Sequence, residues 1–385
     1  MAWSAKKMKQ SRPPGPRLLP GHARTGGRNV IFAWEQCKLG DVADITTGSR
    51  NHQDSVTDGK YPFFVRSDKV ERLNEYDFDT RAILVPGDGR IGEIFHYYNG
   101  KFALHQRVYK VDNFNGINAL FLLGQFKYSF KKHSLRLNAQ GTVPSLRLPM
   151  FTNWNISIPN ITEQERIGSF FRKLDRTITL HEEKKRQLER LKSALMQKMF
   201  ANKNGYPAVR FEGFSNEWEH CKLGDVADIT TGSRNHQDSV TDGKYPFFVR
   251  SDKVERLNEY DFDTKAILVP GDGRIGEIFH YYNGKFALHQ RVYKVDNFNG
   301  INELFLLGLF KYSFKEHALR LNAQGTVPSL RLPMFTNWSI SVPMITEQER
   351  IGVFFQKLER TISLYDHKLE LLKKVKRSML QAMFI

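Results

Sequence analysis

Cysteine is scarce in this sequence of 385 residues, since Cys37 and Cys221 are the only two. Such a pair cannot form the disulfide framework of a small secreted domain, whereas the length leaves room for two domains with cores of their own. Runs of apolar residues fall well short of the roughly 20 residues that cross a bilayer, and the N-terminal stretch lacks the apolar segment of a signal peptide. We therefore expect a cytoplasmic protein that does not enter a membrane.

Signatures of catalysis are also lacking. The sequence contains no GxxxxGK[ST] loop for nucleotide phosphates, no Asn-Pro-Pro-aromatic or Asp-Pro-Pro-aromatic motif of an amino-methyltransferase, and no ligand spacing typical of zinc or calcium. Residues 87–92 match the dinucleotide-binding pattern GxGxxG, but strand-forming residues follow them where that motif requires a helix. A tight turn between strands, with Arg90 at its tip, is the favoured interpretation. We expect no catalysis and no metal or cofactor in this chain.

Acidic residues are missing from the N-terminus. The first 31 residues hold seven lysines and arginines without one aspartate or glutamate, and the whole chain has a formal net charge of +17. A basic balance of this size favours a polyanionic partner, most often nucleic acid, although an acidic protein or a membrane surface also attracts it. We interpret residues 1–33 as a basic, disordered extension.

What the chain does contain is a repeat of domain size. Residues 37–180 recur at 221–364 with a constant offset of 184 and twelve substitutions. A near-identical duplication presents the same surface twice, which suits a target with two identical parts. The repeat predicts two globular domains at 34–160 and 218–344, two long helices at 161–201 and 345–385, and a linker at 202–217.

Each globular copy combines strand and helix patterns. In the first copy, short β-type runs occur at 62–65, 82–85, 93–98, 108–111 and 154–158, and a helical pattern spans 117–133. Asn99-Gly100 favours positive φ at both central positions of a turn, so we predict a hairpin turn at 98–101. These patterns predict an α+β domain with a twisted, mostly antiparallel sheet.

Each helical copy begins with a capping-box pattern, in which the hydroxyl of Thr162 and the carboxylate of Glu165 would satisfy free amide groups. The apolar residues that follow recur at spacings of three and four, which favours a coiled-coil seam over a helix that lies on a globular core. One seam cannot stay exposed, so we predict that the two helices pair antiparallel and relate the globular copies by an approximate two-fold axis. The predicted seam residues are Leu174, Ile178, Leu188, Leu195, Leu358, Ile362, Leu369 and Leu372.

Polar and basic clusters stand in predicted loops at 46–53, 66–69, 105–107 and 138–142, and all of them are duplicated. Arg, Asn and Gln can make bidentate contacts to base edges, while Ser, Thr and Lys hold phosphates. Each cluster alone is typical of a solvated loop, but together, in a basic chain, they favour DNA reading. The predicted DNA contacts are Arg50, Asn51, Gln53, Arg66, Lys69, Arg90, Gln140 and Thr142, with their copies Arg234, Asn235, Gln237, Arg250, Lys253, Arg274, Gln324 and Thr326.

The order of motifs resembles that of the specificity subunits of type I restriction-modification systems. The resemblance covers residues 34–385. It rests on 34–48 with its copy 218–232, and on Gly-Lys-Phe-Ala-Leu-His-Gln-Arg-Val-Tyr, Gly-Thr-Val-Pro-Ser-Leu-Arg and Thr-Glu-Gln-Glu-Arg-Ile-Gly in both halves. It implies two target-recognition domains, each of which reads half of a bipartite site in double-stranded DNA. It also implies two methyltransferase subunits that bind S-adenosylmethionine, joined in some complexes by restriction subunits with motor and nuclease activity.

This chain departs from the family pattern because its two recognition domains are nearly the same. Two different domains read an asymmetric site, so equal domains about a two-fold axis predict an interrupted palindrome. Two other classes stay open at this level: a stand-alone DNA-binding regulator or coiled-coil scaffold, and a nuclease with an unrecognised active site. A regulator would bind its site tightly alone, and a nuclease would cut DNA alone with a divalent metal.

Overall fold

A computed structural model describes residues 34–138, 144–201, 205–322 and 328–384 of the chain. The chain divides into two compact units, residues 1–181 with 368–385 and residues 182–367. Each unit therefore contains one globular copy, the start of the long helix that follows this copy, and the end of the other long helix. Among the described residues, no helix is both long enough and apolar enough to cross a membrane.

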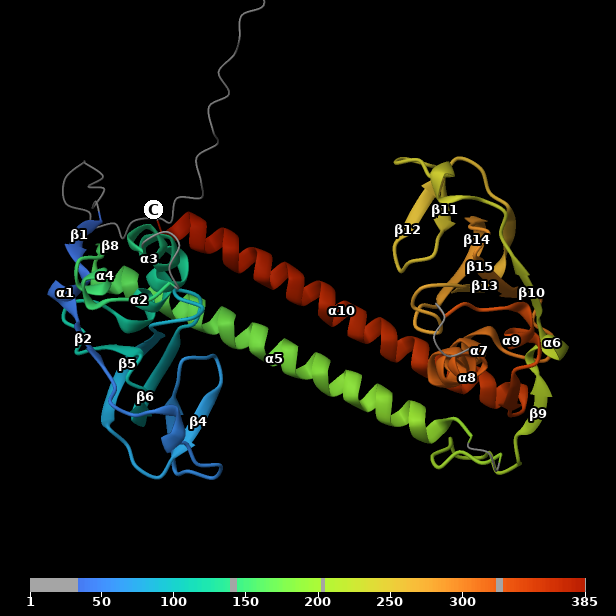
Figure 1. Ribbon diagram of the computed structural model, residues 1–385, viewed down its shortest axis with the longest axis horizontal. Helices are drawn as coiled ribbons and strands as arrows, with labels where there is room; N and C mark the ends of the chain where they lie inside the picture. Colours follow the sequence, from blue (N-terminus) through green and yellow to red (C-terminus); the bar gives the residue numbers. More distant parts are fainter. Residues whose placement is uncertain (1–33, 139–143, 202–204, 323–327, 385) are drawn as a thin grey trace, which may run out of the picture. The chain divides into compact units, whose positions relative to one another are not determined.

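The first unit is built around a six-stranded sheet (Figure 1). Strand β3 runs parallel to β6, and the other neighbouring pairs are antiparallel, which confirms the predicted, mostly antiparallel sheet. A separate two-stranded sheet joins β1 (Glu35–Lys38) to β8 (Asn155–Ile158), the two ends of the globular copy. The strands of the main sheet, in the order β2-β7-β5-β6-β3-β4, are β2 (Asp44–Thr47), β7 (Val108–Asp112), β5 (Phe78–Pro86), β6 (His96–Leu104), β3 (Tyr61–Phe64) and β4 (Val70–Leu73).

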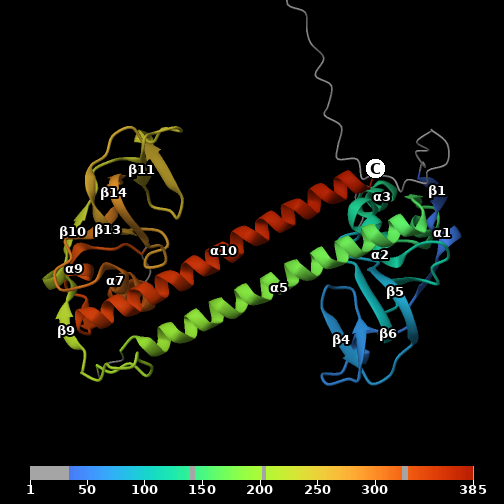
Figure 2. The same ribbon diagram turned by 180° about the vertical axis from the view of Figure 1, so that it is seen from behind.

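The second unit repeats this topology strand for strand. Figure 2 shows several of its strands from behind. The small sheet pairs β9 (Glu219–Lys222) with β16 (Ser339–Val342). The main sheet consists of β10 (Asp228–Thr231), β15 (Val292–Asp296), β13 (Phe262–Pro270), β14 (His280–Leu288), β11 (Tyr245–Phe248) and β12 (Val254–Leu257).

Short helices cover one face of each sheet. A π-helical turn joins two of them in both copies, and it directs two phenylalanines into the core while an intervening lysine reaches the long helices. The first copy has α1 (Leu39–Val42), η1 (His52–Asp54), α2 (Ala119–Gln125), the π turn η2 (Phe126–Phe130), α3 (Lys131–Leu137) and α4 (Leu148–Thr152). The second has α6 (Leu223–Val226), η3 (His236–Asp238), α7 (Glu303–Leu309), the π turn η4 (Phe310–Phe314), α8 (Lys315–Leu321) and α9 (Leu332–Thr336).

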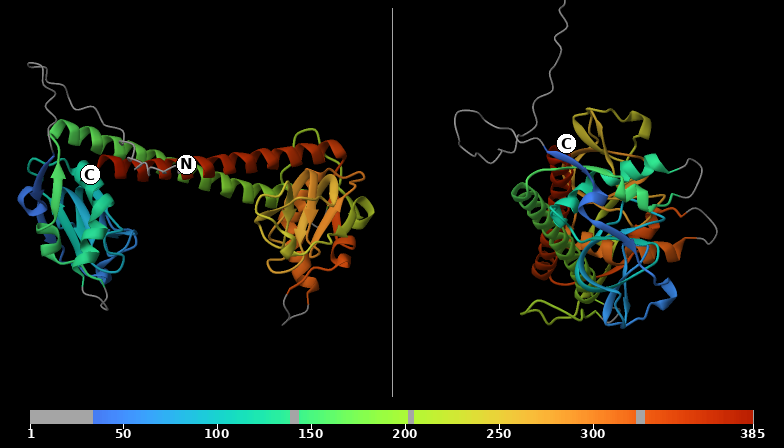
Figure 3. Two further views of the ribbon diagram at one scale, coloured as in Figure 1. Left: turned by 90° about the horizontal axis from the view of Figure 1, so that it is seen from above. Right: turned by 90° about the vertical axis from the view of Figure 1, so that its left-hand side faces the viewer.

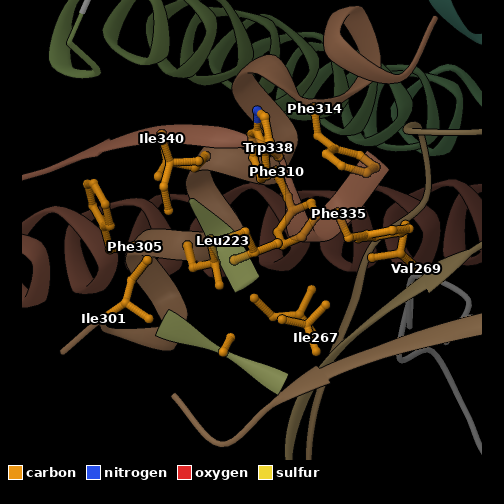
Figure 4. Packing of buried hydrophobic residues seen from close by; sticks show 14 of the residues in the cluster. Leu223, Ile267, Val269, Ile301, Phe305, Phe310, Phe314, Phe335, Trp338 and Ile340 are labelled. Atoms are coloured by element: carbon orange, nitrogen blue, oxygen red, sulfur yellow. The ribbon is translucent and has the colours of Figure 1, made fainter. Parts of the chain in front are cut away.

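Aromatic rings form the centre of the core between the sheet and the helices. In the second unit, the ring of Phe314 lies 4.9 Å from that of Phe310, 4.8 Å from Phe335 and 4.9 Å from Trp338, between centroids (Figure 4). All four side chains are buried, and the same four types occupy the counterpart positions of the first unit. Truncation of one such ring typically costs about 3–5 kcal/mol, so this cluster fixes how the helices sit on the sheet.

The two long helices, α5 (Ile161–Met199) and α10 (Ile345–Met383), pack antiparallel. In the first unit, Lys376 Nζ lies 2.6 Å from Asp175. In the second unit, Lys192 Nζ lies 2.6 Å from Glu359. Residue numbers that rise along α5 meet numbers that fall along α10, and in each unit the end of one helix lies beside the start of the other (Figure 3). The predicted antiparallel pairing of the helices is confirmed.

The predicted seam residues face the interior of this pairing. Ile178 and Leu369 are buried, and the other six are half-buried. Three leucines outside the predicted seam, Leu180, Leu191 and Leu364, are instead exposed. The spacing of three and four residues therefore separates the inner from the outer leucines of both helices.

Each long helix ends with a phenylalanine that enters the core of a globular copy. Phe384, directly after α10, is fully buried in the first unit, where its ring lies 5.3 Å from Phe121 and 5.8 Å from Phe171. Gly124 makes room for it, because a Cβ at that position would stand 2.6 Å from the ring. Phe200, directly after α5, fills the same place in the second unit. Each globular copy is thus closed by the helix that follows the other copy.

The predicted hairpin turn at 98–101 is wrong. These residues lie inside β6 and pair with β5 without a break, so that Gly100 faces Thr80. Gly100 adopts a φ of +133°, a conformation open to glycine that lets the strand continue. Pairing with β5 wins over the local turn preference because the same strand continues to Phe102 and Leu104, which a turn would remove from the core.

The predicted capping box at 162–165 is also wrong. Helix α5 begins at Ile161, and the side-chain oxygen of Asn160 accepts a hydrogen bond from the backbone N–H of Glu163 at 3.0 Å. The predicted hydroxyl cap therefore lies inside the first turn. Asparagine is the stronger N-cap of the two residue types, and it stands one residue before the helix. In the second copy Met344 replaces it, and its backbone carbonyl accepts the corresponding bond.

Candidate nucleic-acid interface

The polar loops predicted from the sequence come together on each globular copy. Four segments are involved, and together we call them the loop cluster. In the first copy they are residues 48–55 after β2, 66–69 after β3, 87–95 between β5 and β6, and 105–107 between β6 and β7. The second copy has the same cluster 184 residues later, and both clusters are identical in sequence.

Backbone hydrogen bonds join the four segments. The N–H of Gln106 donates to the carbonyl of Arg50 at 2.9 Å, which ties the first segment to the fourth. The N–H of Gly87 donates to the carbonyl of Arg107 at 2.7 Å, which ties in the third. The N–H of His105 donates to the last residue of β3 at 3.0 Å, and this brings the second segment alongside. The loop cluster is therefore one connected surface.

Side chains add further contacts between the segments. Gln106 Nε2 donates to Asn51 Oδ1 at 2.6 Å, and Arg66 lies 3.4 Å from Asp88. The second copy repeats these contacts with Gln290 and Asn235 at 2.6 Å and with Arg250 and Asp272 at 3.4 Å. The geometry of the cluster is therefore the same in both units.

Arg50 belongs to the loop cluster, but its guanidinium is bound by carboxylates of the same chain. Its guanidinium lies 2.9 Å from both Asp77 and Glu75, and 28% of its side chain is exposed. The hydrogen bonds to Asp77 and Glu75 raise the pKa of Arg50 above its ordinary value. To contact a base, this side chain would have to leave two carboxylates, so the geometry favours a positioning role. Its copy Arg234 makes the same two ion pairs.

Most of the other predicted contact residues point to solvent. Asn51, Gln53 and Lys69 are exposed, as are 54% of the Arg66 side chain and 64% of Arg90, and their copies are exposed as well. Arg66 lies 3.4 Å from Asp88, and Arg90 lies 3.0 Å from Glu93 and 4.0 Å from Asp68, all as ion pairs at the surface. Such side chains can exchange a surface ion pair for a phosphate or a base edge at little cost. Gln140, Thr142, Gln324 and Thr326 lie outside the described residues.

Two exposed arginines of this surface were missed by sequence reasoning. Arg107 belongs to the fourth segment, and Arg147 follows Leu146, whose N–H donates to the carbonyl of Gly87 at 2.6 Å. The sequence did contain a signal, since Arg107 stands in the polar cluster at 105–107 and Arg147 ends the repeated Gly-Thr-Val-Pro-Ser-Leu-Arg motif. The copies Arg291 and Arg331 are exposed in the same way.

Two histidines, one in the cluster and one directly after its third segment, have structural roles. His105 is buried, and its Nδ1 accepts a hydrogen bond from the backbone N–H of Arg107 at 2.9 Å. Burial, together with nearby Arg66, lowers the pKa of His105 below its ordinary value. Burial also lowers the pKa of His96, which bonds the carbonyl of Ser67. These rings are therefore neutral at pH 7 and brace the loops.

The segment that matches GxGxxG is a turn within the loop cluster. Gly89 and Gly92 have φ values of +73° and +66°, and the chain continues into β6 at His96. This confirms a tight turn between strands in place of a nucleotide-binding loop. In the residues that the structure describes, no group of three or more His, Cys, Asp or Glu side chains could hold a metal ion.

Comparison with known proteins gives the family. The model of the type I restriction modification DNA specificity domain matches residues 33–190 and again 215–374. The chain is 26% identical over 376 residues to the type I restriction enzyme EcoDI specificity subunit of Escherichia coli, a match that covers 83% of this chain and 79% of the relative. It is 23% identical over 398 residues to the MjaVIII specificity subunit of Methanocaldococcus jannaschii, which covers 92% of each.

A solved structure has the same fold. The S subunit of a type I restriction-modification system from M. genitalium superposes with a TM-score of 0.72 at 16% identity, over 93% of this chain and 97% of that chain. The two family matches together span most of the sequence, one on each copy. The chain therefore belongs to the specificity-subunit family of type I restriction-modification systems, in which it is the DNA specificity subunit and not a catalytic one.

Proposed function

We propose that this specificity subunit reads an interrupted palindrome through its two loop clusters. The observation that carries the proposal is their identity, residue for residue, with the same internal contacts. The helix contacts are also repeated, because a shift of 184 residues converts the pair Asp175–Lys376 into the pair Glu359–Lys192, and the antiparallel helices are proposed to relate the two readers by a two-fold axis. Equal readers about such an axis require equal half-sites in opposite orientation.

The exposed side chains of the loop cluster divide by chemistry. Arginine, asparagine and glutamine match base edges, while lysine and the arginines at the rim suit phosphates. Arg50 and Arg234 position the loops. The proposed base readers are Asn51, Gln53, Arg66, Arg90 and Gln140 with their copies, and the proposed phosphate contacts are Lys69, Arg107, Thr142 and Arg147 with theirs.

The partners follow from the relatives, which are specificity subunits of type I restriction enzymes. The chain is proposed to assemble with two methyltransferase subunits that carry S-adenosylmethionine, and with restriction subunits where the system contains them. Its target-recognition domains are proposed to span 34–160 and 218–344. Methyl transfer and cleavage are then carried out by the partners, and this chain determines the DNA sequence at which they act.

Mapping of modified adenines tests the palindrome. The full chain is assembled with the methyltransferase subunit of its own system, and the methylated positions are located in genomic DNA. The expected result is one half-site repeated in inverted orientation across an unread spacer. Two unrelated half-sites, or two in direct repeat, would contradict the equivalence or the pairing of the copies. Tight, specific DNA binding by the chain without partners would favour a stand-alone regulator.

A further inference from the structure

A broad groove separates the globular copy from the long helices in the second unit. It has a volume of about 850 Å³ and lies between α8, the π turn η4, the end of α5 and the start of α10. Three lysines and four glutamates are among its lining residues. The charged residues are Lys192, Lys311, Lys315, Glu189, Glu277, Glu316 and Glu359. We call this the helical groove.

The first unit has the same framework of ion pairs. Lys127 and Lys376 both lie 2.6 Å from Asp175, as Lys311 and Lys192 both lie 2.6 Å from Glu359. Burial opposes the ionised carboxylate, but the lysines outweigh burial and keep the pKa of Asp175 and of Glu359 below the ordinary value. Lys131 pairs with Glu93 as Lys315 pairs with Glu277. The walls of the groove therefore correspond.

The charge at these positions differs between the two units. Exposed Lys132 stands where the second unit has exposed Glu316, and exposed Arg377 stands where it has Ser193. Lys373 takes the place of Glu189, which pairs with Lys185 at 3.4 Å. The counterpart positions of the first unit thus hold six cations, Lys127, Lys131, Lys132, Lys373, Lys376 and Arg377, against two carboxylates, Glu93 and Asp175. One groove is strongly basic, and the other is close to neutral.

The basic groove is continuous with the loop cluster. Glu93 belongs to the segment 87–95, and its carboxylate lies 3.0 Å from Arg90 while it also pairs with Lys131 of α3. Arg90 and Lys131 thus flank one carboxylate, and a polyanion that lies on Arg90 meets Lys131 and Lys132 next. This continuity favours the DNA backbone over an acidic protein segment, because the neighbouring surface is the one that receives DNA.

We propose that the counterpart surface of the first unit, around Lys131, Lys132 and Arg377, binds backbone phosphates of the DNA beside its half-site, and that the groove of the second unit does not. The inference rests on the proposed function of the loop cluster. Lysine and arginine bind phosphates without reading bases, and each such contact adds to the salt dependence of binding. The two half-sites are then read alike but held unequally, so the subunit is directional on a symmetric site.

Charge reversal at one pair of counterpart positions tests the groove. Lys132→Glu puts into the first unit the residue that the second unit already has, and Glu316→Lys does the opposite, so both changes suit the fold. Each variant of the full chain is assembled with its methyltransferase subunit, and affinity for the mapped site is measured against salt. Lys132→Glu should lower the slope of log affinity against log salt by about one contact, and Glu316→Lys should raise it. Arg377→Glu should match Lys132→Glu.

DNA with neutral phosphates tests whether the subunit holds the two half-sites unequally. Methylphosphonates are placed in the DNA beside one half-site or beside both, on the side that faces the helices. Neutralisation beside one should cost only about twofold, because the subunit can turn over on the palindrome and one of two orientations remains. Neutralisation beside both should cost about tenfold. The proposal would be overturned if the first and the second neutralisation lowered the affinity by equal factors, or if neither lowered it.

Two further outcomes separate this proposal from its neighbours. Weaker assembly of Lys132→Glu with the methyltransferase subunit, at unchanged DNA affinity of the assembled complex, would assign the groove to a protein partner and overturn the inference. If the complex with the unsubstituted chain shows no sequence preference, the proposed function of the loop cluster is refuted instead. The change in salt slope between Lys132→Glu and the unsubstituted chain reports the groove, since Lys132 stands outside the loop cluster.

Discussion

The loop side and the helical side of the repeated domain have diverged to different degrees. Of the twelve substitutions between the copies, one precedes residue 119 and eleven fall between 119 and 179, on α2, α3, β8 and the start of α5. The loop cluster has none. A side chain whose partner lies in the same chain can change together with that partner, whereas the proposed partner of the loop cluster, DNA, does not change with it.

Two substitutions, one on β5 and one at the start of α2, show such a joint change. In the second unit Lys265 lies 3.3 Å from Glu303, and Tyr281 donates to the same carboxylate at 3.2 Å. In the first unit the counterparts are Arg81 and Ala119, and the guanidinium of Arg81 lies over the ring of Phe114. The helical side has therefore exchanged an ion pair for a cation–π contact without a change of fold.

The closing phenylalanines give the largest expected effect. Phe384→Ala should destabilise the first unit by about 3–5 kcal/mol, because it empties a fully buried site beside Phe121 and Phe171. Phe200→Ala is the matched variant and should act on the second unit. Calorimetry of both variants should show a different part of the transition moved to lower temperature in each. An unchanged transition in either variant would contradict the closing role of its phenylalanine.

The loop side should separate readers from positioning residues. Arg66→Ala should weaken binding of the mapped site by about 1–3 kcal/mol and relax one base preference, with thermal stability unchanged. Arg50→Ala should lower both affinity and stability, because Glu75 and Asp77 lose their shared partner. Binding to randomised half-sites and thermal unfolding are measured for both. If Arg50→Ala relaxes one base preference at full stability, Arg50 is a reader.

Acidic pH should loosen the loop cluster of both units equally. Burial lowers the pKa of His105 and of His289, so the folded chain takes up their protons less readily than the unfolded chain, in which histidine titrates near 6.5. Their contribution to stability is then fully present above about pH 6.5 and is lost as the pH falls below it. Unfolding free energy measured between pH 5 and 8 checks this. His105→Gln should flatten the dependence, and an unchanged slope would contradict the assignment.

The exchanged ion pair should have the smallest effect. A double-mutant cycle on Lys265→Ala and Glu303→Ala should give a coupling of about 0.2–1 kcal/mol, because Lys265 is largely exposed. Truncations at the counterpart positions of the first unit, Arg81→Ala and Ala119→Gly, provide the control cycle and should show no coupling. If the coupling free energy were equal in both units, the ion pair would not be its source. The natural differences at 81/265 and 119/303 would then be independent of each other.

Sequence reasoning reached the architecture because repeats and periodicity are local signals. The repeat at an offset of 184, the helical spacing of Leu174 and Ile178, and the alternation in the strands each depend on residues near in sequence. It failed where distant residues compete. Asn99-Gly100 favours a turn by itself, but pairing with β5 keeps it in a strand. Thr162 looks like a cap, but Asn160 stands closer to the helix start.

Residue types and their order were enough to place the chain in its family, to predict two equal recognition domains, and to locate polar loops suited to DNA. Only the tertiary structure decided which of those polar side chains are available. It showed that Arg50 is occupied by Glu75 and Asp77, that Arg147 joins the loop cluster, and that Glu316 and Ser193, the counterparts of Lys132 and Arg377, line the same groove. The physical reason is that ion pairs and grooves join residues far apart along the chain, and such partners leave no mark in local spacing.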